Sequence, residues 1–487
     1  MFLNKSNQDE CKAIFKNIID EGVNAKLNNK FMEKSFNPDN LEQLLDMPFK
    51  GENINSLIKY FTEQIIPYCS NFSNTGFMSF PDAGNSVAGL SGALFADFLQ
   101  QNLINSSFCA PIATYIEIAV INWLRRVVGY DNNKINNIWD VGGVITYGGT
   151  GSNATAMMLA RENHKRNTMQ QGVVSPSDYI TIIPKGIGHY SIRSASMWLG
   201  LGNNIIEVET NNFKYNLEAL RETIRKYKGR IMCVVAYVGD SRTMTIDNLE
   251  EVYEIVKQED EHIWLHADAC HGFSLGFSNK HKHKIKGIEK FDSISTDPHK
   301  VLDLPYCLSA LLVKNPETFK NITSTSDLIM QEDYAFGQIT PFIGSKSWVS
   351  LKLWFVIKNL GIEGIEKMID DRLEMAQLLK KKIEQEQDII LINDVDINSV
   401  VFMYAPKSIR YNVEKLNAVS KKIHDIMAKE GLYHLHQFSL EDNKSVVSEK
   451  AILYPLRYMS GNPNITEQDL DNMLEYVKKI GAIIVNE

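Results

Sequence analysis

The sequence contains few cysteines, and they are scattered. Only 6 occur in 487 residues, and no CxxC pair is present. Zinc ribbons need such pairs, and disulfide-stabilised folds are short and much richer in cysteine. The sequence therefore predicts neither a metal site nor a disulfide framework, and a reducing, cytoplasmic location is the simplest expectation.

Long apolar runs and excess positive charge are also absent. The most apolar stretch, residues 87–103, is interrupted by polar residues and glycine, so it falls short of a membrane-spanning helix. The first residues turn polar at once, which is untypical of a signal peptide. The net charge of -8 provides no electrostatic footprint for nucleic acid and disfavours anionic membrane surfaces. We expect neither nucleic acid nor a membrane as a partner.

Two common nucleotide-binding signatures are missing as well. The glycine-rich turn Gly148-Gly149-Thr150-Gly151-Ser152-Asn153 has neither the P-loop spacing nor the GxGxxG spacing of dinucleotide-binding folds. This disfavours a nucleotide-binding α/β enzyme. The turn does offer backbone N–H groups and hydroxyls at the start of a predicted helix, a combination that binds phosphate.

From about residue 140, short β-rich runs alternate with helical patterns. Such alternation is typical of an α/β domain with a mostly parallel sheet. The β-rich runs are 144–146, 179–183, 205–208, 231–238, 263–266, 293–296 and 308–313, and helical patterns near 152–166, 189–199, 215–228 and 247–259 separate several of them.

Chain length and changes of pattern predict three parts. A chain of 487 residues exceeds one ordinary core. Residues 1–110 are expected to form an N-terminal helical segment, residues 111–385 a large α/β domain, and residues 386–487 a small C-terminal α+β domain. The large domain ends in a long helical stretch, residues 346–385, which is broken near Gly361.

Lys300 and Asp268 carry the strongest chemical signal. Lys300 ends the run Asp297-Pro298-His299-Lys300 after a strand, and Asp268 ends the preceding strand. A lysine there is usually solvated, and an aspartate there often caps a helix. However, open α/β sheets bind ligands at the carboxyl ends of their strands. A lysine that forms a Schiff base, a carboxylate that keeps a ring nitrogen protonated and a phosphate-binding turn together suit pyridoxal 5'-phosphate (PLP).

Two further residues fit around a planar cofactor. His189 lies between a predicted strand and a predicted helix, where a histidine is commonly a cap or a surface residue. Beside a planar ring, its imidazole becomes a candidate for stacking. Cys270 is expected near the ring face as a small apolar contact, although a buried structural thiol would be placed in the same way.

These motifs resemble those of the PLP-dependent group II amino-acid decarboxylases, which include the aromatic-amino-acid, tyrosine, glutamate and cysteine-sulfinate decarboxylases. Asp292 to Lys300 is similar to the lysine signature of the family, and His266-Ala267-Asp268-Ala269 is similar to its pyridinium-pairing strand. The spacing from His189 and Asp268 to Lys300 also fits the family. The resemblance spans roughly residues 70–480.

The resemblance implies the aspartate-aminotransferase-like fold, known as fold type I, and a homodimer with active sites at the subunit interface. It implies that Lys300 carries PLP, that Asp268 pairs with the ring nitrogen and that His189 stacks on the ring. The other cofactor residues it implies are Thr150, Gly151 and Ser152 at the phosphate, Cys270 beside the ring, and His299 at the cofactor or substrate.

The chain also departs from the family at several positions. Where relatives often carry an arginine before Leu351-Lys352-Leu353-Trp354, this chain has Lys346. Tyr334 is the expected counterpart of the loop tyrosine that returns a proton in relatives. If Phe336 occupies that position instead, an aldehyde-forming, oxygen-consuming outcome becomes open. Asp82 stands where several relatives have a neutral residue near the substrate.

The sequence therefore predicts decarboxylation of a small-molecule L-amino acid to its amine and CO2. An aromatic substrate is modestly favoured, because Phe80 and Phe108 fall in segments that build the substrate pocket in relatives, although both also suit an ordinary core. Asp82 is the third expected substrate contact. Another PLP-dependent carbon–carbon or carbon–sulfur lyase remains open, as does a catalytically silent homologue that acts as a binding protein.

Overall fold

The computed structural model of the protein describes residues 2–28, 30–45, 47–81, 86–131, 134–323, 326 and 333–486. A seven-stranded sheet lies at its centre, with strand order β1-β9-β8-β7-β6-β2-β3. Strands β8, β7, β6, β2 and β3 run parallel, and β9 is antiparallel to both of its neighbours. The strands are β1 (Gly143–Thr146), β2 (Ile180–Pro184), β3 (Ile205–Val208), β6 (Ile231–Tyr237), β7 (Trp264–Asp268), β8 (Ser293–Thr296) and β9 (Ser309–Val313).

Each of these strands corresponds to a β-rich run that the sequence predicts, to within a few residues at the ends. Because helices cover both faces of the sheet, every residue of six of its strands is buried, including polar ones such as His266 and Ser293, while the edge strand β3 is partly exposed. The predicted α/β fold with a mostly parallel sheet is therefore confirmed. The exception is β9, which runs antiparallel beside β8 after the connection that contains α11.

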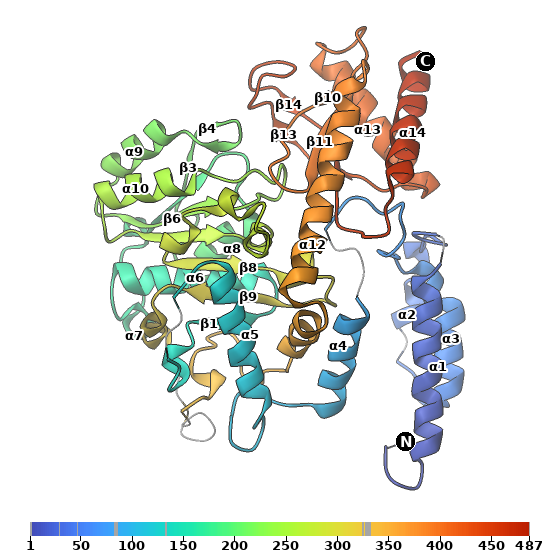
Figure 1. The fold of residues 1–487 in the computed structure, drawn as a ribbon, viewed down its shortest axis with the longest axis vertical. Coiled ribbons are helices and arrows are strands. Elements are labelled where there is room, and N and C mark those ends of the chain that lie inside the picture. Colours follow the sequence, from blue (N-terminus) through green and yellow to red (C-terminus); the bar gives the residue numbers. More distant parts are fainter. Residues whose placement is uncertain are drawn as a thin grey trace.

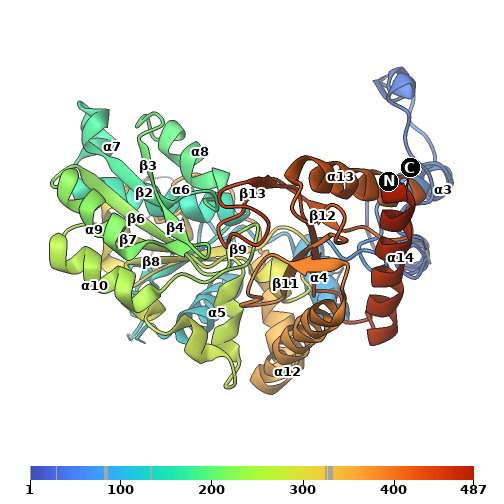
Figure 2. The ribbon, with the colours of Figure 1, turned by 90° about the horizontal axis from the view of Figure 1, so that it is seen from above.

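Helices α6 and α8 lie on one side of the sheet, and α5 and α10 lie on the other (Figure 2). Helix α6 packs on the central strands, which places its first turn at the carboxyl ends of β7 and β8. The helices of this domain are α5 (Ala113–Val127), α6 (Gly149–His164), α7 (Thr168–Gln171), α8 (Tyr190–Trp198), α9 (Leu217–Lys226), α10 (Leu249–Glu259) and α11 (Pro298–Val301), and a small hairpin joins β4 (Thr210–Asn211) to β5 (Lys214–Tyr215).

A second, smaller sheet lies beside the first, with strand order β10-β11-β15-β12 and antiparallel pairing throughout (Figure 1). Its hydrophobic residues form a second core that is distinct from the core of the large sheet. This part of the chain contains β10 (Ile389–Leu391), β11 (Ser399–Tyr404), α13 (Val413–Glu430), β12 (His436–Gln437), β13 (Leu440–Glu441), β14 (Ile452–Leu453), β15 (Leu456–Met459) and α14 (Glu467–Asn486), of which β13 and β14 pair separately from the four-stranded sheet.

Helix α12 (Ser350–Gln385) connects the two parts and packs against α4 (Val87–Leu99) and α5. Gly361 has non-helical angles inside it (φ 64°), so the helix is kinked where the sequence predicts a break. Residues of α12 contribute first to the large core and then, from Ala376 onward, to the small one. The boundaries at residues 110 and 385 stay predictions.

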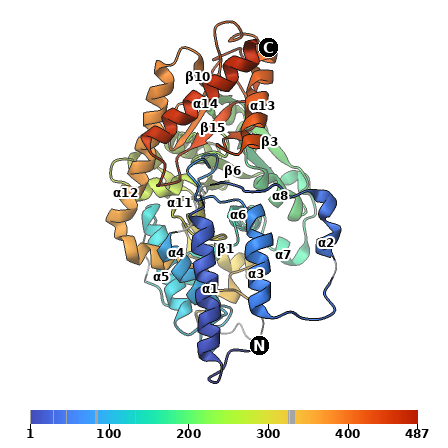
Figure 3. The same cartoon turned by 90° about the vertical axis from the view of Figure 1, so that its right-hand side faces the viewer.

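The N-terminal segment forms α1 (Gln8–Lys26), α2 (Glu42–Leu45) and α3 (Ile54–Gln64), which stand to one side of the rest of the molecule in Figure 1 and face the viewer in Figure 3. Apolar side chains of α1 and α3 are exposed, among them Phe15, Ile19 and Phe61. Within the described part of the chain, no helix is both long and apolar enough to cross a membrane.

Candidate active site

The carboxyl ends of β7 and β8 bring Lys300 and Asp268 to one cavity of about 350 Å³. Asp268 is the last residue of β7, and Lys300 lies on the single turn of α11 that follows β8. These strands are parallel neighbours, with Asp268 opposite Ser295. Because parallel strands end at the same edge of the sheet, two residues far apart in sequence become neighbours in space.

A network of buried polar groups holds the Asp268 carboxylate. The side-chain amide of Asn153, on α6, donates to Asp268 Oδ2 (2.9 Å) and to Ser191 Oγ (2.8 Å). Asn153 Oδ1 accepts from Ser295 Oγ (2.7 Å) and lies 3.0 Å from His266 Nε2. All four hydrogen-bonding positions of the amide are therefore used, which fixes its orientation and that of the carboxylate.

His266 is a further member of this network, between Asn153 and Ser293. Burial lowers the pKa of His266 to about 4, so its imidazole is neutral at neutral pH. Its Nδ1 lies 2.8 Å from Ser293 Oγ, which also accepts a hydrogen bond from Trp264 Nε1 (2.8 Å). This arrangement leaves the proton on Nε2, where it faces Asn153 Oδ1. Asp268 is thus held by uncharged groups, and its negative charge remains available to a ligand.

Lys300 forms an ion pair with Asp297 at the other side of the cavity. Lys300 Nζ lies 2.9 Å from Asp297 Oδ2, and Asp297 is only 2% exposed. Burial alone would lower the pKa of Lys300, but the charge of Asp297 outweighs it and raises this pKa above its usual value. Burial likewise opposes ionisation of Asp297, yet Lys300 and His299 hold its pKa below the usual value. Asp297 lies in the motif that ends at Lys300, but the motif alone did not predict a role for this residue.

Helix α6 begins at the glycine-rich turn, and Gly148, Gly149 and Thr150 line the same cavity. Gly148 has a positive φ of 83°. A Cβ atom at Gly149 would lie 2.6 Å from Cys270 Sγ and 2.9 Å from Asp297 Oδ2. Glycine is therefore required where the turn approaches β7 and α11, and the first N–H groups of α6 are left at the cavity.

The other predicted phosphate residues lie further along α6. Ser152 is fully buried, and its hydroxyl lies 2.6 Å from Thr146 Oγ1, so it is already hydrogen-bonded. Gly151 and Thr150 line a separate apolar cavity of about 330 Å³, together with Trp198 and Phe342. Thr150 alone of the three lines the Lys300 cavity, and the roles of all three stay predictions.

His189 caps the N-terminus of α8 at the edge of the cavity. Its backbone N–H donates to the hydroxyl of Tyr237 (2.8 Å), and its Nδ1 lies 2.6 Å from Ser191 Oγ. Burial lowers the pKa of His189, although Asp268 opposes this. A neutral ring held by its neighbours in this way is suited to stacking against a planar ligand.

His299 and Cys270 line the cavity as well. The imidazole Nδ1 of His299 lies 2.8 Å from the carbonyl oxygen of Leu308, and its ring packs edge-on against Tyr306. Burial, followed by the charge of Asp268, raises the pKa of the Cys270 thiol well above its usual value. Cys270 therefore stays a thiol and offers a small apolar surface.

A larger cavity of about 680 Å³ adjoins the first and shares Lys300 and His189 with it. Three distant parts of the chain build its other walls: Phe80 from the N-terminal segment, Arg242 from the loop after β6, and the small domain. The small domain contributes His436, Phe438 and Arg457. The sequence predicted Phe80 here and missed the others, because no motif marks them.

Arg457 lies on β15 and is buried beneath aromatic rings. Its guanidinium stands 5.4 Å from the ring centroid of Phe438 and 5.9 Å from that of Phe80. It donates to the backbone carbonyl oxygens of Ser241 (2.6 Å) and Ser79 (3.0 Å), and its Nε has no hydrogen-bond partner among the described residues. Burial lowers the pKa of Arg457 to about 10, which still leaves it charged at neutral pH.

Two predicted residues, Tyr334 and Phe108, are not brought to Lys300 within this chain. Tyr334 packs edge-on against Tyr115 (5.3 Å between ring centroids) and lines neither of the two cavities. Phe108 is 70% exposed and is likewise absent from both. Asp82 lies outside the described residues. Phe336, the alternative to the loop tyrosine, is fully buried and has the ammonium of Lys346 5.5 Å from its ring centroid.

Lys346 forms a buried ion pair with Glu117. The two side chains are at most 1% exposed, and Lys346 Nζ lies 2.7 Å from Glu117 Oε1. Ser350 donates to the other carboxylate oxygen of Glu117 (2.8 Å). Lys346 therefore joins α5 to the start of α12, and it does not line either cavity around Lys300.

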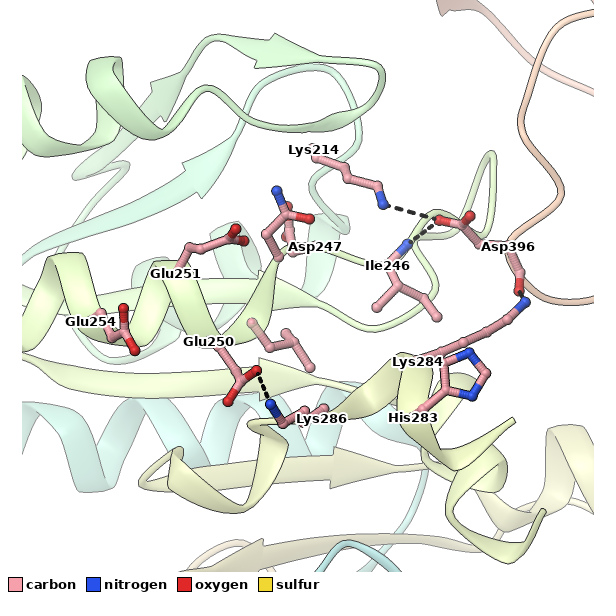
Figure 4. A pocket seen from close by; sticks show the side chains of 12 residues that line it. Lys214, Ile246, Asp247, Glu250, Glu251, Glu254, His283, Lys284, Lys286 and Asp396 are labelled. Atoms are coloured by element: carbon pink, nitrogen blue, oxygen red, sulfur yellow. Dashed lines mark hydrogen bonds and ion pairs between the residues drawn. The ribbon is translucent and has the colours of Figure 1, made fainter. Parts of the chain in front are cut away.

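A third, charged cavity of about 640 Å³ lies away from Lys300, between the β4–β5 hairpin and the start of α10 (Figure 4). Its lysines are compensated. Lys214 pairs with Asp396 (3.6 Å) and Lys286 with Glu250 (2.9 Å), while Lys284 donates to the backbone carbonyl of Asp396 (2.6 Å).

The cavity around Lys300 fits PLP. It is within the size range of cofactor pockets. It presents a lysine amine, a buried carboxylate whose charge no cation neutralises, and a glycine-rich helix start, and PLP needs all three. Asp297 Oδ1 is buried with no hydrogen-bond partner in the described part of the chain, which leaves an acceptor beside the amine. Fold and cavity together define a PLP-dependent enzyme of fold type I.

Comparison with known proteins gives the family. The model of the pyridoxal-dependent decarboxylase conserved domain matches residues 38–405, about three quarters of the chain. The chain belongs to this family, and it is a PLP-dependent amino-acid decarboxylase. An aromatic-L-amino-acid decarboxylase of Bacillus atrophaeus is 25% identical over 90% of this chain and 87% of the relative. An acidic amino acid decarboxylase of Mus musculus is 26% identical over 97% and 85%.

A solved structure agrees with the fold. Oryza sativa TDC with PLP and tryptamine superposes with a TM-score of 0.87 at 17% sequence identity, and the match covers 99% of this chain and 100% of that one. At this identity the match supports the fold alone. The predicted family, fold class and cofactor are confirmed, whereas the relatives act on side chains of two different classes.

Proposed function

We propose that this decarboxylase holds PLP on Lys300 and releases the α-carboxyl group of an L-amino acid as CO2, which leaves the amine. The observation that carries the proposal is the meeting of Lys300, Asp268 and the α6 turn in one cavity. When bound, PLP accepts the electron pair that remains on the α-carbon as CO2 departs.

Asp268 is proposed to hold a proton on the ring nitrogen of the cofactor. The position of this carboxylate at the end of β7 supports the proposal. Asn153 donates a hydrogen bond to it, and no cation of the described residues forms an ion pair with it. An anion in a dry site favours a protonated nitrogen strongly, because the low dielectric strengthens the interaction. His189 and Cys270 are proposed to contact the faces of the ring, and Thr150, Gly151 and Ser152 to hold the phosphate through the start of α6.

Lys300 and Asp297 are proposed to share the proton that must move when the amine reacts. An amine attacks a carbonyl only when it is deprotonated, and the raised pKa of Lys300 keeps it as an ammonium in the cofactor-free protein. Asp297, 2.9 Å away and with one oxygen free of hydrogen bonds among the described groups, is placed to receive that proton. His299, beside Asp297 on the same turn, is proposed to contact cofactor or substrate.

Arg457 is proposed to bind the α-carboxylate of the incoming substrate. It is 2% exposed, it lines the cavity that also contains Lys300, and its bonds go to backbone carbonyls rather than to a carboxylate. Burial lowers the pKa of Arg457 and the charge of Asp240 opposes this, but no carboxylate of the described residues forms an ion pair with it. A buried guanidinium of this kind attracts an anion because burial has already removed its water.

The protein is proposed to act as a homodimer in which Tyr334 serves the active site of the second copy. Tyr334 is remote from the Lys300 cavity of its own chain. Large apolar side chains are exposed around the apolar cavity beside that site, with Trp198 63% and Phe342 53% exposed. A second copy that packs against this surface would bury it and would also place its own Tyr334 at this active site as a proton donor.

The substrate side chain has two candidate classes. An aromatic side chain is supported by the rings of Phe80, Tyr190 and Phe438, which line the larger cavity. An acidic side chain is supported by Arg242 in the same cavity. An aldehyde-forming outcome loses its main support, because Phe336 is buried under Lys346 rather than at the site.

The decisive experiment uses the PLP-loaded enzyme with a panel of L-amino acids, and it measures CO2, amine, aldehyde and hydrogen peroxide. The proposal expects CO2 and amine in equal amounts, without peroxide. Cleavage products without CO2 would indicate another lyase, and peroxide with aldehyde would indicate the oxidative reaction. PLP binding without any product would indicate a silent homologue.

A further inference from the structure

The larger cavity carries more positive charge than a single α-carboxylate neutralises. Lys300 and three arginines line it. Lys300 is paired with Asp297 (2.9 Å), and Arg193 is paired with Glu207 (2.8 Å). Arg457 and Arg242 form no ion pair with any carboxylate in the described ranges. Two guanidinium groups therefore remain for a ligand, and the α-carboxylate uses one of them.

Arg242 lies on a loop whose backbone is held by hydrogen bonds to a buried carboxylate. The carboxylate of Asp240 is fully buried and accepts hydrogen bonds from the backbone N–H groups of Arg242 (2.7 Å), Thr243 (2.8 Å) and Thr245 (2.8 Å). Asn393, from the small domain, donates to the carbonyl oxygen of Thr243 (2.8 Å). The backbone at Arg242 is therefore held in place before any ligand arrives, which reduces the entropy lost on binding.

The loop also ties Arg242 to the rest of the site. Arg457 donates to the carbonyl oxygen of Ser241, the residue next to Arg242. Burial is the main cause that lowers the pKa of His189, and the positive charge of Arg242 lowers it further. Arg242 is therefore close enough to His189 to act on it electrostatically. Arg242 thus stands on the same wall as Arg457 and near the proposed ring-stacking histidine.

The charged cavity of Figure 4 offers an internal comparison. There Lys214, Lys284 and Lys286 each have an oxygen partner from the protein itself. By this measure Arg457 is also partly satisfied, since it donates to two backbone carbonyl oxygens. Arg242 is half-buried and lacks such compensation among the described residues, which distinguishes the cavity beside Lys300.

We infer that Arg242 binds an anionic group at the far end of the substrate side chain, and that the preferred substrate is an acidic amino acid with a side-chain carboxylate or sulfinate. The planar guanidinium matches such a group with two parallel hydrogen bonds. This inference rests on the proposed function, because it takes the larger cavity as the substrate site. The aromatic rings of the cavity then pack along the side chain rather than select it.

The kinetic test compares L-glutamate, L-aspartate and L-cysteine sulfinate with L-phenylalanine and L-tyrosine on the PLP-loaded enzyme. We expect kcat/KM for the best acidic substrate to exceed that for either aromatic one at least tenfold. In Arg242→Met, kcat/KM for the acidic substrate should fall about 10- to 100-fold, while that for the aromatic substrates changes less than threefold. Arg242→Lys should retain part of the acidic preference, since it keeps the charge and loses the fork.

Arg193→Met is the matched control, because it removes an arginine of the same cavity that already has a partner in Glu207. Its ratio of acidic to aromatic kcat/KM should stay within threefold of the wild-type ratio. An aromatic preference in the wild-type enzyme would overturn the inference. An equal loss on all substrates in Arg242→Met would also overturn it, because that pattern indicates a structural role.

A binding test separates this inference from the proposed function. Glutarate and valerate, which lack the amino group and cannot be decarboxylated, are titrated into the PLP-loaded protein by calorimetry. We expect glutarate to bind at least tenfold more tightly than valerate, and Arg242→Met to abolish the difference. Equal affinities would overturn the inference even if CO2 is released. Selective glutarate binding without CO2 from any amino acid would support the anion site and contradict the proposed reaction.

Discussion

The two halves of the candidate active site are built differently. Elements of a single sheet form the cofactor half, where Asp268, Asn153 and Lys300 follow or face neighbouring strands. The substrate half combines Phe80, Arg242 and Arg457, which come from the N-terminal segment, a loop and the small domain. The cofactor half is surrounded by the hydrophobic core of the large sheet, whereas the substrate half lies where that core meets the core of the small domain.

The difference follows from what each half has to do. The cofactor is the same for every member of such a family, so its half can be a rigid, fully hydrogen-bonded network that leaves only the ligand-facing groups unsatisfied. The substrate differs among relatives, and a site assembled from separate segments can change one wall without disturbing the sheet. The following predictions test this division, from the largest expected effect to the smallest.

Replacement of Lys300 should have the largest effect. Lys300→Ala is expected to reduce turnover by about 10⁴-fold or more, because it removes the nucleophile while the rest of the site stays. The absorbance band of protein-bound PLP that borohydride removes should also be lost. Lys320→Ala, at a half-exposed lysine on the surface, serves as the control and should behave like the wild type. Near-normal rates in Lys300→Ala would contradict the assignment.

Asp268→Asn should be the next most damaging change, with about 10²- to 10³-fold lower kcat. The substitution keeps the shape and removes the charge that faces the ring nitrogen. Asp292→Asn is the matched control, because Asp292 lies at the opposite end of the same strands, where it accepts the N–H of Leu265 (2.8 Å). That control should lower the free energy of unfolding by about 1 kcal/mol and leave kcat unchanged. Equal kcat values for the two variants would refute the proposed role of Asp268.

Arg457→Met tests the substrate half alone. It should lower kcat/KM by about 10- to 100-fold for every amino acid, since each carries the α-carboxylate. The spectrum and affinity of bound PLP should stay the same, because Arg457 lines only the larger cavity. Loss of PLP binding in this variant would show that the two halves are not separable.

The smallest expected effect is the pH dependence of stability, which reports on both halves. Burial lowers the pKa of His266 and of His436 to about 4 and that of His271 to about 3, whereas unfolded histidines titrate near 6.5. Below about pH 6.5 the unfolded chain therefore binds three more protons at these histidines, and stability is lost as pH falls. Asp247 offsets one of them, because burial raises its pKa to about 7 and the folded state keeps its proton.

The net difference is two protons, so we expect the free energy of unfolding to decrease by about 2.7 kcal/mol per pH unit between roughly pH 6 and pH 4.5. Chemical denaturation of the PLP-free protein over this range measures it. His266→Gln should make the dependence shallower by about one proton. A free energy of unfolding that rises as pH falls would show that the buried carboxylate, and not the histidines, dominates.

The sequence predicted some site residues because their signals are local. Lys300, Asp268 and the α6 turn lie in short motifs beside strands, and strands can be recognised from a few apolar residues. Asn153 was within the quoted turn, yet its role depends on Asp268, which is distant in sequence. Phe108 resembled Phe80 in the sequence, and only the structure shows that, of the two, Phe80 lines the larger cavity.

The sequence by itself predicted the sheet and the cofactor class correctly, and it proposed Lys300 as the reactive lysine, because periodicity and short motifs report on contacts between nearby residues. Only the tertiary structure decided which charges are compensated. Lys346 is paired with Glu117 and Arg193 with Glu207, while Arg242 and Arg457 line the cavity and form no ion pair with an acid of the described residues. The strength of an ion pair depends on distance and burial, which packing sets and which local sequence does not encode.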